Sequence, residues 1–360
     1  MAYKILYIED QATESRESDL ANLGFDVCTF DPSSDISEIL QQIQTDTNAL
    51  ILDYRLTAGK KYACFDAPTI AQTLRSKHSH DANKKTEIPI ILMSNEEIIT
   101  DYYNDFSSQD LFDFTLTKKA FTDNQPKFAH KLKSFICGYK KIKADNFDII
   151  KILGLQDEDE ELIHPNIKVK LYQYNENIFE YSSLIFDDII RSIGMVIGED
   201  LLSARLGISK KSEDWEKVKE SLSTTKYTGI LSEVYPRWWM VKINKWWEEV
   251  VNSKIPLRRL DADERVEVIK QGLSLSNLEP VEKTKYSEST NFWTICKHSN
   301  APIDPFDGIE LFKKDYYPWQ EKEFISIDSA LNNMDQYKEI ISPIDVKAIR
   351  ELARKVNANG

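Results

Sequence analysis

The sequence lacks the cysteine patterns of a protein that is stabilised by disulfide bonds or by structural zinc. Its four cysteines, Cys28, Cys64, Cys137 and Cys296, lie far apart and form no CxxC pair, which argues against a disulfide framework or a zinc site. No uncharged apolar run approaches the roughly 18 residues that a membrane span requires. No basic leader precedes the apolar stretch 3–8. We therefore expect a cytoplasmic protein without a membrane segment.

Positive charge is also in deficit. The 360 residues include 46 lysines and arginines against 59 aspartates and glutamates, a net charge of −13. A field of this sign repels phosphate backbones, so nucleic acid is not the expected partner. Hydrophobic content of 41% and charged content of 29% are ordinary for a globular protein, and the length suggests two or three domains.

Strand and helix patterns alternate over the first 140 residues. Apolar runs with the length of buried strands occur at 3–8, 25–30, 49–53, 88–93 and 112–116. Helical spacing predicts helices at 11–23, 35–45 (capped by Ser34), 67–76, 96–108 and 123–140. Repeated β/α units predict an α/β fold: a doubly wound, five-stranded parallel sheet with right-handed crossovers.

Polar side chains stand where these strands end. Glu9 and Asp10 follow the first strand, Asp53 ends the third, and Ser94 and Lys118 follow the fourth and fifth. The carboxyl ends of parallel strands share one edge of a sheet, so three carboxylates would meet there. Their repulsion calls for a hard cation, and Mg2+ prefers such oxygen ligands. With a lysine and a hydroxyl beside them, the carboxylates predict a site that transfers a phosphoryl group to Asp53.

Four segments carry a family resemblance: Ile5-Leu6-Tyr7-Ile8-Glu9-Asp10, Leu50-Ile51-Leu52-Asp53, Ile91-Leu92-Met93-Ser94 and Leu116-Thr117-Lys118. Together they resemble the flavodoxin-like receiver domain of two-component response regulators, over about residues 3–140. The resemblance implies that Asp53 is the phosphoacceptor, Ser94 the switch hydroxyl and Lys118 the family's lysine. It implies Mg2+ as cofactor, bound by Asp10, by Asp53, by Glu9 largely through water, and by the backbone carbonyl of Arg55.

The resemblance further implies a histidine kinase or phosphotransfer protein as partner and no enzyme activity beyond phosphotransfer and dephosphorylation. Three features depart from the family pattern. Lys119 replaces the usual proline, the loop 60–66 is longer than usual, and Thr115 takes the place of the aromatic switch residue. A degenerate receiver that serves only as a scaffold is therefore an alternative, although every charged position of the site is filled.

The pattern changes after residue 140. An acidic run, 157–161, lies just before His164-Pro165 and suggests a linker. We predict a receiver domain at 1–140, a linker at 141–165 and an output domain of mostly α or α+β structure at 166–360. Apolar residues over 178–206 predict one long helix or two, with a break near 194–198, ending at Gly207.

All seven tryptophans lie from Trp215 onward. Trp215 and Val218 fit a short helix, and the spacing of Trp239, Ile243, Trp246, Trp247 and Val250 predicts another, with Pro236 in its first turn. Paired tryptophans can form an interface. A buried core is the favoured interpretation, because several large apolar side chains on one helix cannot all stay exposed.

Two further motifs contain residue types that can catalyse reactions or bind metal ions. Cys296 and His298 are too few, and too alone, for a catalytic or metal pair. The segment 304–308, Asp-Pro-Phe-Asp-Gly, predicts a turn rather than a calcium loop, because it lacks enough carboxylates.

Three classes of function remain open. The first is a phosphoacceptor whose C-terminal domain binds a downstream protein or which acts as a phosphoryl sink, with a bacterial defence-type two-component system as one setting and a homodimer as one option. The second is a transcription factor with an unrecognised DNA-binding output, which the acidic balance disfavours. The third is a receiver-gated enzyme, for which the sequence offers no catalytic motif.

Overall fold

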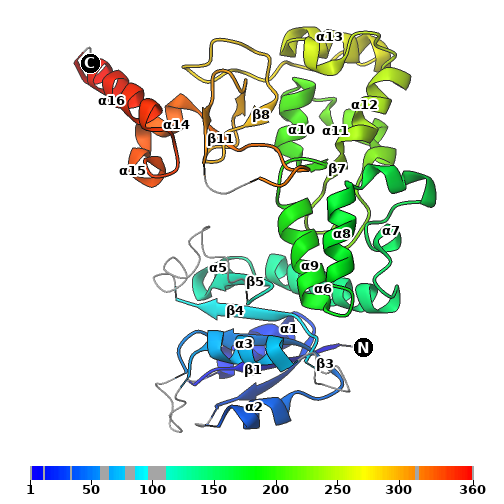
Figure 1. Cartoon of the computed structure of the whole chain (residues 1–360), viewed down its shortest axis with the longest axis vertical. Helices are drawn as coiled ribbons and strands as arrows, with labels where there is room; N and C mark the ends of the chain where they lie inside the picture. Colours follow the sequence, from blue (N-terminus) through cyan, green and yellow to red (C-terminus); the bar gives the residue numbers. More distant parts are fainter. Residues whose placement is uncertain are drawn as a thin grey trace. The chain divides into compact units, whose positions relative to one another are not determined.

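The computed structural model describes residues 2–10, 13–32, 35–56, 65–77, 86–95, 111–312 and 316–358. Their contacts divide the chain into two compact units (Figure 1). Unit 1 comprises Met1–Glu158, Ile167–Phe186 and Gly229–Val234, and unit 2 comprises Asp159–Asn166, Asp187–Thr228 and Tyr235–Gly360. This division is interleaved along the chain, unlike the boundaries predicted at 140 and 166, which stay a prediction.

A five-stranded parallel sheet forms the centre of unit 1, in the order β2-β1-β3-β4-β5. Its strands are β1 (Tyr3–Ile8), β2 (Phe25–Phe30), β3 (Thr47–Asp53), β4 (Ile90–Ser94) and β5 (Phe114–Thr117). The first and third strands are adjacent in this order, which is that of flavodoxin-like doubly wound sheets. The helix predicted at 96–108 and residues 60–64 of the loop at 60–66 lie outside the described residues.

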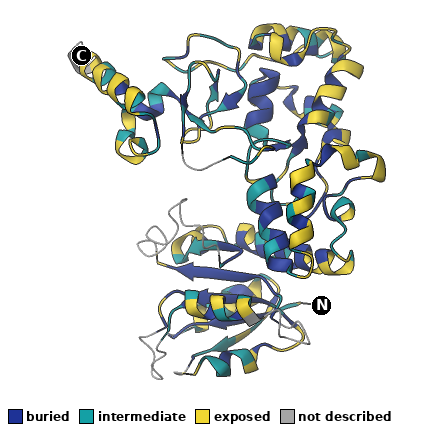
Figure 2. Ribbon diagram, in the orientation of Figure 1, coloured by how far each residue is buried: buried dark blue, intermediate teal, exposed yellow. Residues whose placement is uncertain are grey.

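Helices cover both faces of this sheet. They are α1 (Glu14–Asn22), α2 (Ile36–Gln42), α3 (Ala67–Lys77), α5 (Lys118–Asp123) and α6 (Gln125–Ala144). Side chains alternate along a strand, so Leu50 and Leu52 point to one face, where they form a core with α2 and α3. On the other face the Tyr3 hydroxyl meets Cys137 Sγ of α6 at 3.2 Å. Figure 2 shows the strands buried between these layers.

The start of α2 differs from the prediction by one residue. Asp35, not Ser34, caps the helix: its side chain accepts a hydrogen bond from the Ser37 N–H at 2.8 Å. Both residue types satisfy a free N–H at a helix start, so the sequence alone does not separate them.

Helix α6 is longer and more buried than a surface helix requires. Its predicted apolar positions are all buried, namely Phe128, Leu132, Phe135 and Ile136. Phe135 also meets Phe186, with ring centroids 5.2 Å apart, and Gly138 lies against Ile230. Unit 1 therefore extends past the sheet, through α7 (Ile149–Ile152), most of α8 (Pro165–Gln173) and α9 (Ile178–Ser183).

A buried ion pair joins these parts of unit 1. Asp113, just before β5, pairs with Arg75 of α3 at 2.8 Å and accepts a 2.6 Å hydrogen bond from the Tyr139 hydroxyl of α6. The Arg75 guanidinium lies over the ring of Phe179 in α9, 3.7 Å from its centroid. Three helices are thus tied to one carboxylate that is 1% exposed.

We expect Asp113→Ala to lower the free energy of unfolding by about 3–5 kcal/mol, because it leaves the Arg75 charge buried without its carboxylate. Urea unfolding followed by circular dichroism measures this loss. Asp46→Ala is the matched control: it breaks the exposed pair with Lys4, and should cost less than about 1 kcal/mol. Equal losses would contradict the assigned role of Asp113.

Unit 2 is mostly helical, and its described residues form three two-stranded sheets, β6-β7, β8-β9 and β10-β11. Its strands are β6 (Val196–Ile197), β7 (Trp238–Trp239), β8 (Thr294–Ile295), β9 (Pro302–Ile303), β10 (Ile309–Glu310) and β11 (Phe324–Ile325). Its α-helices are α10 (Glu199–Leu206), α11 (Trp215–Ser221), α12 (Met240–Glu249), α13 (Ala262–Leu273), α14 (Ile327–Asn332), α15 (Met334–Tyr337) and α16 (Pro343–Ala358). Single turns occur at η2 (Asp157–Leu162), η4 (Ser223–Thr225) and η5 (Leu257–Arg259).

The apolar stretch 178–206 does not form one long helix; it forms two helices, which is the second of the two arrangements predicted from the sequence. Helix α9 continues into a π-helical segment, η3 (Leu184–Ile190), and α10 begins only after β6. Within unit 2, Gly194 lies so close to the Trp319 carbonyl that a Cβ would sit 2.0 Å from it. The second helix ends at Gly207 as predicted, in the left-handed region at φ 73°.

The tryptophans form a core, which confirms the favoured interpretation. Trp238, Trp239, Trp246 and Trp247 are each at most 3% exposed. The prediction of Pro236 in the first turn of their helix is wrong, because α12 starts at Met240. Trp238 and Trp239 are extended instead and pair with Ile197 and Val196.

Two fully buried arginines hold unit 2 together. Arg265 donates to the carbonyls of Arg205 and Phe292, at 3.1 and 2.7 Å, and so closes the carboxyl end of α10. Arg205 pairs with Glu321 at 2.6 Å and lies over the ring of Trp293. Among the described helices, none is long and apolar enough to cross a membrane.

Candidate functional site

The strand ends of unit 1 bring the predicted polar residues to one edge. Ile8 pairs with Leu52 in the sheet, so Glu9, which follows β1, stands beside Asp53 at the end of β3. Asp53 pairs in turn with Met93, and Ser94 with Thr117. The edge therefore carries residues from four adjacent strands, because β1, β3, β4 and β5 run in the same direction.

Three carboxylates cluster at this edge. Glu9, Asp10 and Asp53 each offer an oxygen, and these atoms lie within 4.8 Å of one another. The three residues are 4%, 9% and 6% exposed. Glu9 Oε1 is buried and accepts no hydrogen bond from the described residues. Such crowding of buried negative charge is unfavourable without a nearby cation.

The ammonium group of Lys118 brings positive charge to two of these carboxylates. Its Nζ lies 2.8 Å from Glu9 Oε2 and 3.1 Å from Asp53 Oδ1. The lysine is the first residue of α5, and the Thr117 side chain before it caps that helix by accepting from the Ala120 N–H. One ammonium group is thus shared between two carboxylates, and its position is fixed by a helix start.

Tyr7 is a member of the site that our sequence analysis missed. Its hydroxyl donates to Glu9 Oε2 at 2.9 Å, the oxygen that Lys118 also contacts. Tyr7 and Glu9 are two residues apart, a spacing that places side chains on the same face of an extended chain. This spacing was the available signal. Both donors bind Oε2 of Glu9, whereas Oε1 has no hydrogen-bond donor among the described residues.

The two carboxylates that share the Lys118 ammonium group have pKa values shifted in opposite directions. Burial is the largest single influence and opposes ionisation of Glu9, but the hydrogen bond and charge of Lys118, together with the hydrogen bond from Tyr7, hold the pKa of Glu9 below its ordinary value. Burial and then the charge of Glu9 raise the pKa of Asp53 from 3.8 to about 6, against the attraction of Lys118. Burial would lower the pKa of Lys118, yet its carboxylate partners raise it. Asp53 is therefore the weakest acid of the pair that Lys118 contacts.

Ser94 and Arg55 lie where the sequence placed them. Ser94 ends β4 and is 2% exposed, one residue beyond the partner of Asp53 in the sheet. Arg55 follows Asp53 by two residues, and its side chain is exposed. The roles of switch hydroxyl and carbonyl ligand stay predictions.

The carboxylate cluster fits a hard divalent cation. All three offered atoms are carboxylate oxygens, the donor type that Mg2+ selects. A cation there would stabilise these buried carboxylates, of which Glu9 Oε1 has no hydrogen-bond partner among the described residues. Glu9, Asp10 and Asp53 are the residues that would hold it.

Cys296 and His298 do not form a second site. Cys296 is buried, with its Sγ 3.2 Å from the Ser329 hydroxyl, whereas the His298 ring meets the Tyr337 hydroxyl at 3.0 Å. The turn at 304–308 is present as predicted, and Asp304 accepts from the Phe306 N–H. Within the described part of the chain, the group at Glu9, Asp10 and Asp53 is the one set of at least three metal-ligating side chains.

Comparisons with known proteins were made for the whole chain. No family model and no curated protein matches it. Solved structures with a similar fold are mostly receiver domains, and they cover the N-terminal part of the chain. Their low identities and TM-scores leave the argument about function to the site itself.

Three of these structures illustrate the likeness. A receiver domain from Methylobacillus flagellatus is 20% identical over 33% of this chain and 87% of its own, with a TM-score of 0.24. An adenylate cyclase from Rhodopirellula baltica is 14% identical, covering 40% and 95%, with a TM-score of 0.30. The receiver domain of a sensor histidine kinase from Pseudomonas aeruginosa PAO1, with magnesium in its active-site cleft, is 18% identical, covering 38% and 99%, with a TM-score of 0.28.

We expect Asp53→Asn to stabilise the metal-free protein above about pH 7 by about 2–3 kcal/mol. The folded state binds the Asp53 proton more tightly than the unfolded chain, so stability falls as pH rises from 3.8 to about 6. The variant lacks this fall. Urea unfolding in chelator across a pH series measures it. Below about pH 4 both proteins carry a neutral side chain and the difference should vanish. A variant that is no more stable at high pH would contradict the assigned crowding.

Proposed function

We propose that this protein is a response regulator that accepts a phosphoryl group on Asp53. The observation that carries the proposal is the shared ammonium group: Lys118 lies 2.8 Å from Glu9 and 3.1 Å from Asp53, within a cluster of three carboxylates. A buried carboxylate with a raised pKa is a reactive nucleophile once ionised. The donor is the phosphohistidine of a histidine kinase or phosphotransfer protein.

Phosphoryl transfer to Asp53 forms one bond to phosphorus and breaks another. An oxygen of the Asp53 carboxylate forms a bond to phosphorus, and the bond from phosphorus to the histidine nitrogen breaks. The imidazole leaves with the electron pair and takes up a proton. Lys118 follows the charge from the carboxylate to a phosphoryl oxygen, and the Ser94 hydroxyl at the end of β4 donates to another. A Mg2+ ion held by Glu9, Asp10, Asp53 and the Arg55 carbonyl would neutralise the charge of the phosphoryl oxygens.

The output acts at the level of protein contacts in this proposal. The net charge of −13 disfavours a DNA-binding output. In this proposal the chemistry of the chain is phosphotransfer to Asp53 and dephosphorylation. A bacterial defence-type two-component system is one setting for such a pathway. A phosphoryl sink and a degenerate scaffold are the alternatives that the experiments below separate.

With acetyl phosphate and Mg2+, the protein should gain one hydroxylamine-sensitive phosphoryl group, measured by intact-mass spectrometry. Asp53→Asn should abolish it, because an amide oxygen is a poor nucleophile. Asp10→Ala should remove the dependence on Mg2+ along with most of the label.

Asp46→Asn is the matched control, since it changes an exposed carboxylate on the same unit and should leave labelling intact. Label that persists in Asp53→Asn would reject Asp53 as acceptor. No label in the unaltered protein would favour the degenerate scaffold.

A route from the site into the rest of unit 1 supports a switch. Lys118 is the first residue of α5, and α6 follows after Asn124. Helix α6 then packs on α9 and meets Phe186 through Phe135. The receiver family uses this side of the domain for dimers or partners, but here the same chain covers much of it. We therefore propose that the signal passes by repacking within unit 1 rather than through a homodimer formed by α6.

The phosphoryl mimic beryllofluoride should change hydrogen exchange in 112–144 and 178–186, because Lys118 must leave Glu9 to reach the new charge. Mass spectrometry of peptic peptides measures this change. Ser94→Ala should reduce the response while Asp53 is still phosphorylated.

Protection around Asp53 without any response beyond residue 120 would contradict the switch and favour the phosphoryl sink. Thr115 in the place of an aromatic residue would then be the physical reason, since a small side chain cannot couple the site to the helices by packing.

A further inference from the structure

The last helix of unit 2, α16, has two distinct sides. Its apolar side chains begin in a core: Ile349 is buried, and Val346 packs against the same cluster. The stripe continues toward the carboxyl end, where Val356 is 41% exposed. Lys347, Arg350 and Arg354 follow one another at spacings of three and four residues and so share a side of the helix. The helix is therefore amphipathic beyond the length that its own core covers.

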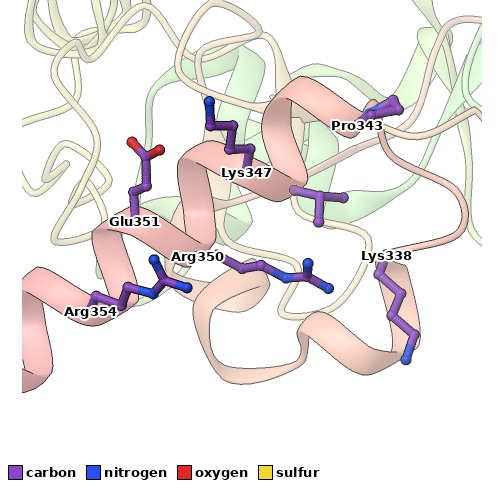
Figure 3. A pocket seen from close by; sticks show the side chains of 7 residues that line it. Lys338, Pro343, Lys347, Arg350, Glu351 and Arg354 are labelled. Atoms are coloured by element: carbon purple, nitrogen blue, oxygen red, sulfur yellow. The ribbon is translucent and has the colours of Figure 1, made fainter.

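A hollow of about 540 Å3 lies along the basic side of α16. Its lining consists of Lys338, Pro343, Val346, Lys347, Arg350, Glu351 and Arg354. Figure 3 shows Arg350 extending from α16 toward the end of α15 that carries Lys338. Four cations and one carboxylate thus surround an apolar floor of Pro343 and Val346. The volume is within the range of ligand pockets, about 300–1,000 Å3.

Three of the four cations of this hollow are unpaired among the described residues. Lys347, Arg350 and Arg354 form no ion pair with any residue that the structure describes, whereas Lys338 pairs with Asp335 at 3.1 Å. Other lysines of unit 2, such as Lys211 and Lys254, are also unpaired within the described part of the chain, but they do not line this hollow. In a chain of net charge −13, unpaired cations gathered on one helix form a local field of opposite sign.

We propose that this hollow binds a short acidic segment of a partner protein, with one apolar side chain on the floor of Pro343 and Val346 and flanking carboxylates on Arg350, Arg354 and Lys347. Arginine favours such pairing because its guanidinium accommodates a carboxylate with two hydrogen bonds. From Lys347 to Arg354 the row spans about 10 Å along the helix axis, which matches a few residues of a bound peptide. The inference stands apart from phosphorylation of Asp53.

Two features favour a peptide over other polyanions. A nucleic acid would contact the cations but leave the apolar floor without a partner, and the overall negative charge repels its long phosphate backbone. A membrane surface requires a broad apolar face, whereas the apolar lining of this hollow is limited to Pro343 and Val346. A peptide with alternating acidic and apolar residues matches both parts of the lining.

The test uses the full chain and fluorescence anisotropy of a labelled synthetic peptide of Asp and Glu residues around central leucines. The peptide should bind, and added salt should weaken it. Arg350→Glu and Arg354→Glu should each weaken binding by about fivefold or more. Lys355→Glu is the matched control: it makes the same charge change on the same helix outside the hollow, and should change the affinity less than about twofold.

Further arms identify the ligand class. A peptide with serine in place of leucine should bind more weakly, because it cannot use the apolar floor. Unchanged circular dichroism and an unchanged urea-unfolding midpoint show that each variant is folded, so this test does not depend on phosphorylation of Asp53. The inference is overturned if the leucine peptide does not bind, if Lys355→Glu weakens it as much as Arg350→Glu, or if duplex DNA or anionic lipid vesicles bind the hollow more tightly than the peptide.

Discussion

One ammonium group serves two buried carboxylates, and the chemistry of unit 1 depends on that imbalance. Lys118 contacts Glu9 and Asp53 while Asp10 adds a third acidic group within reach. The lysine lowers the pKa of Glu9 and leaves that of Asp53 at about 6. The site can therefore accept further positive charge. Of Glu9 and Asp53, the carboxylate of Asp53 is the less stabilised by Lys118. A phosphoryl group that draws Lys118 away would also release Glu9, so the chemical event and the rearrangement of the site are one process.

At the opposite end of the sheet, a buried carboxylate has enough partners to balance its charge. Asp113 has a full set of partners, namely Arg75, Tyr139 and the Ile90 N–H. This arrangement fixes α3 and α6 to the start of β5 while the other edge remains electrostatically unbalanced. Because Arg75 also lies over Phe179, the rigid end extends into α9. A change at Lys118 would then pivot α5 and the start of α6 against a fixed base rather than shift the whole domain.

Much of this could be predicted from the sequence, for reasons that particular residues illustrate. The apolar runs before Glu9 and Asp53 could be predicted as strands because they are short and alternate with amphipathic helices, a pattern that favours a parallel sheet. The tryptophan core followed from size and hydrophobicity alone. Trp238 and Trp239 were misplaced because helical spacing cannot register the pairing with Val196 and Ile197, which are distant in sequence. Tyr7 was missed since a tyrosine in a strand is ordinarily a packing residue.

The hollow on α16 shows where a sequence pattern stops being informative. Basic residues at helical spacing are common on solvated surfaces, and the spacing of Lys347, Arg350 and Arg354 does not distinguish this helix from others. What distinguishes it is that these three unpaired cations line one hollow together with Pro343 and Val346. That arrangement depends on tertiary structure, because Lys338, which precedes the helix, completes the lining. In a protein of net charge −13, cations gathered beside Pro343 and Val346 suit a ligand that is both acidic and partly apolar.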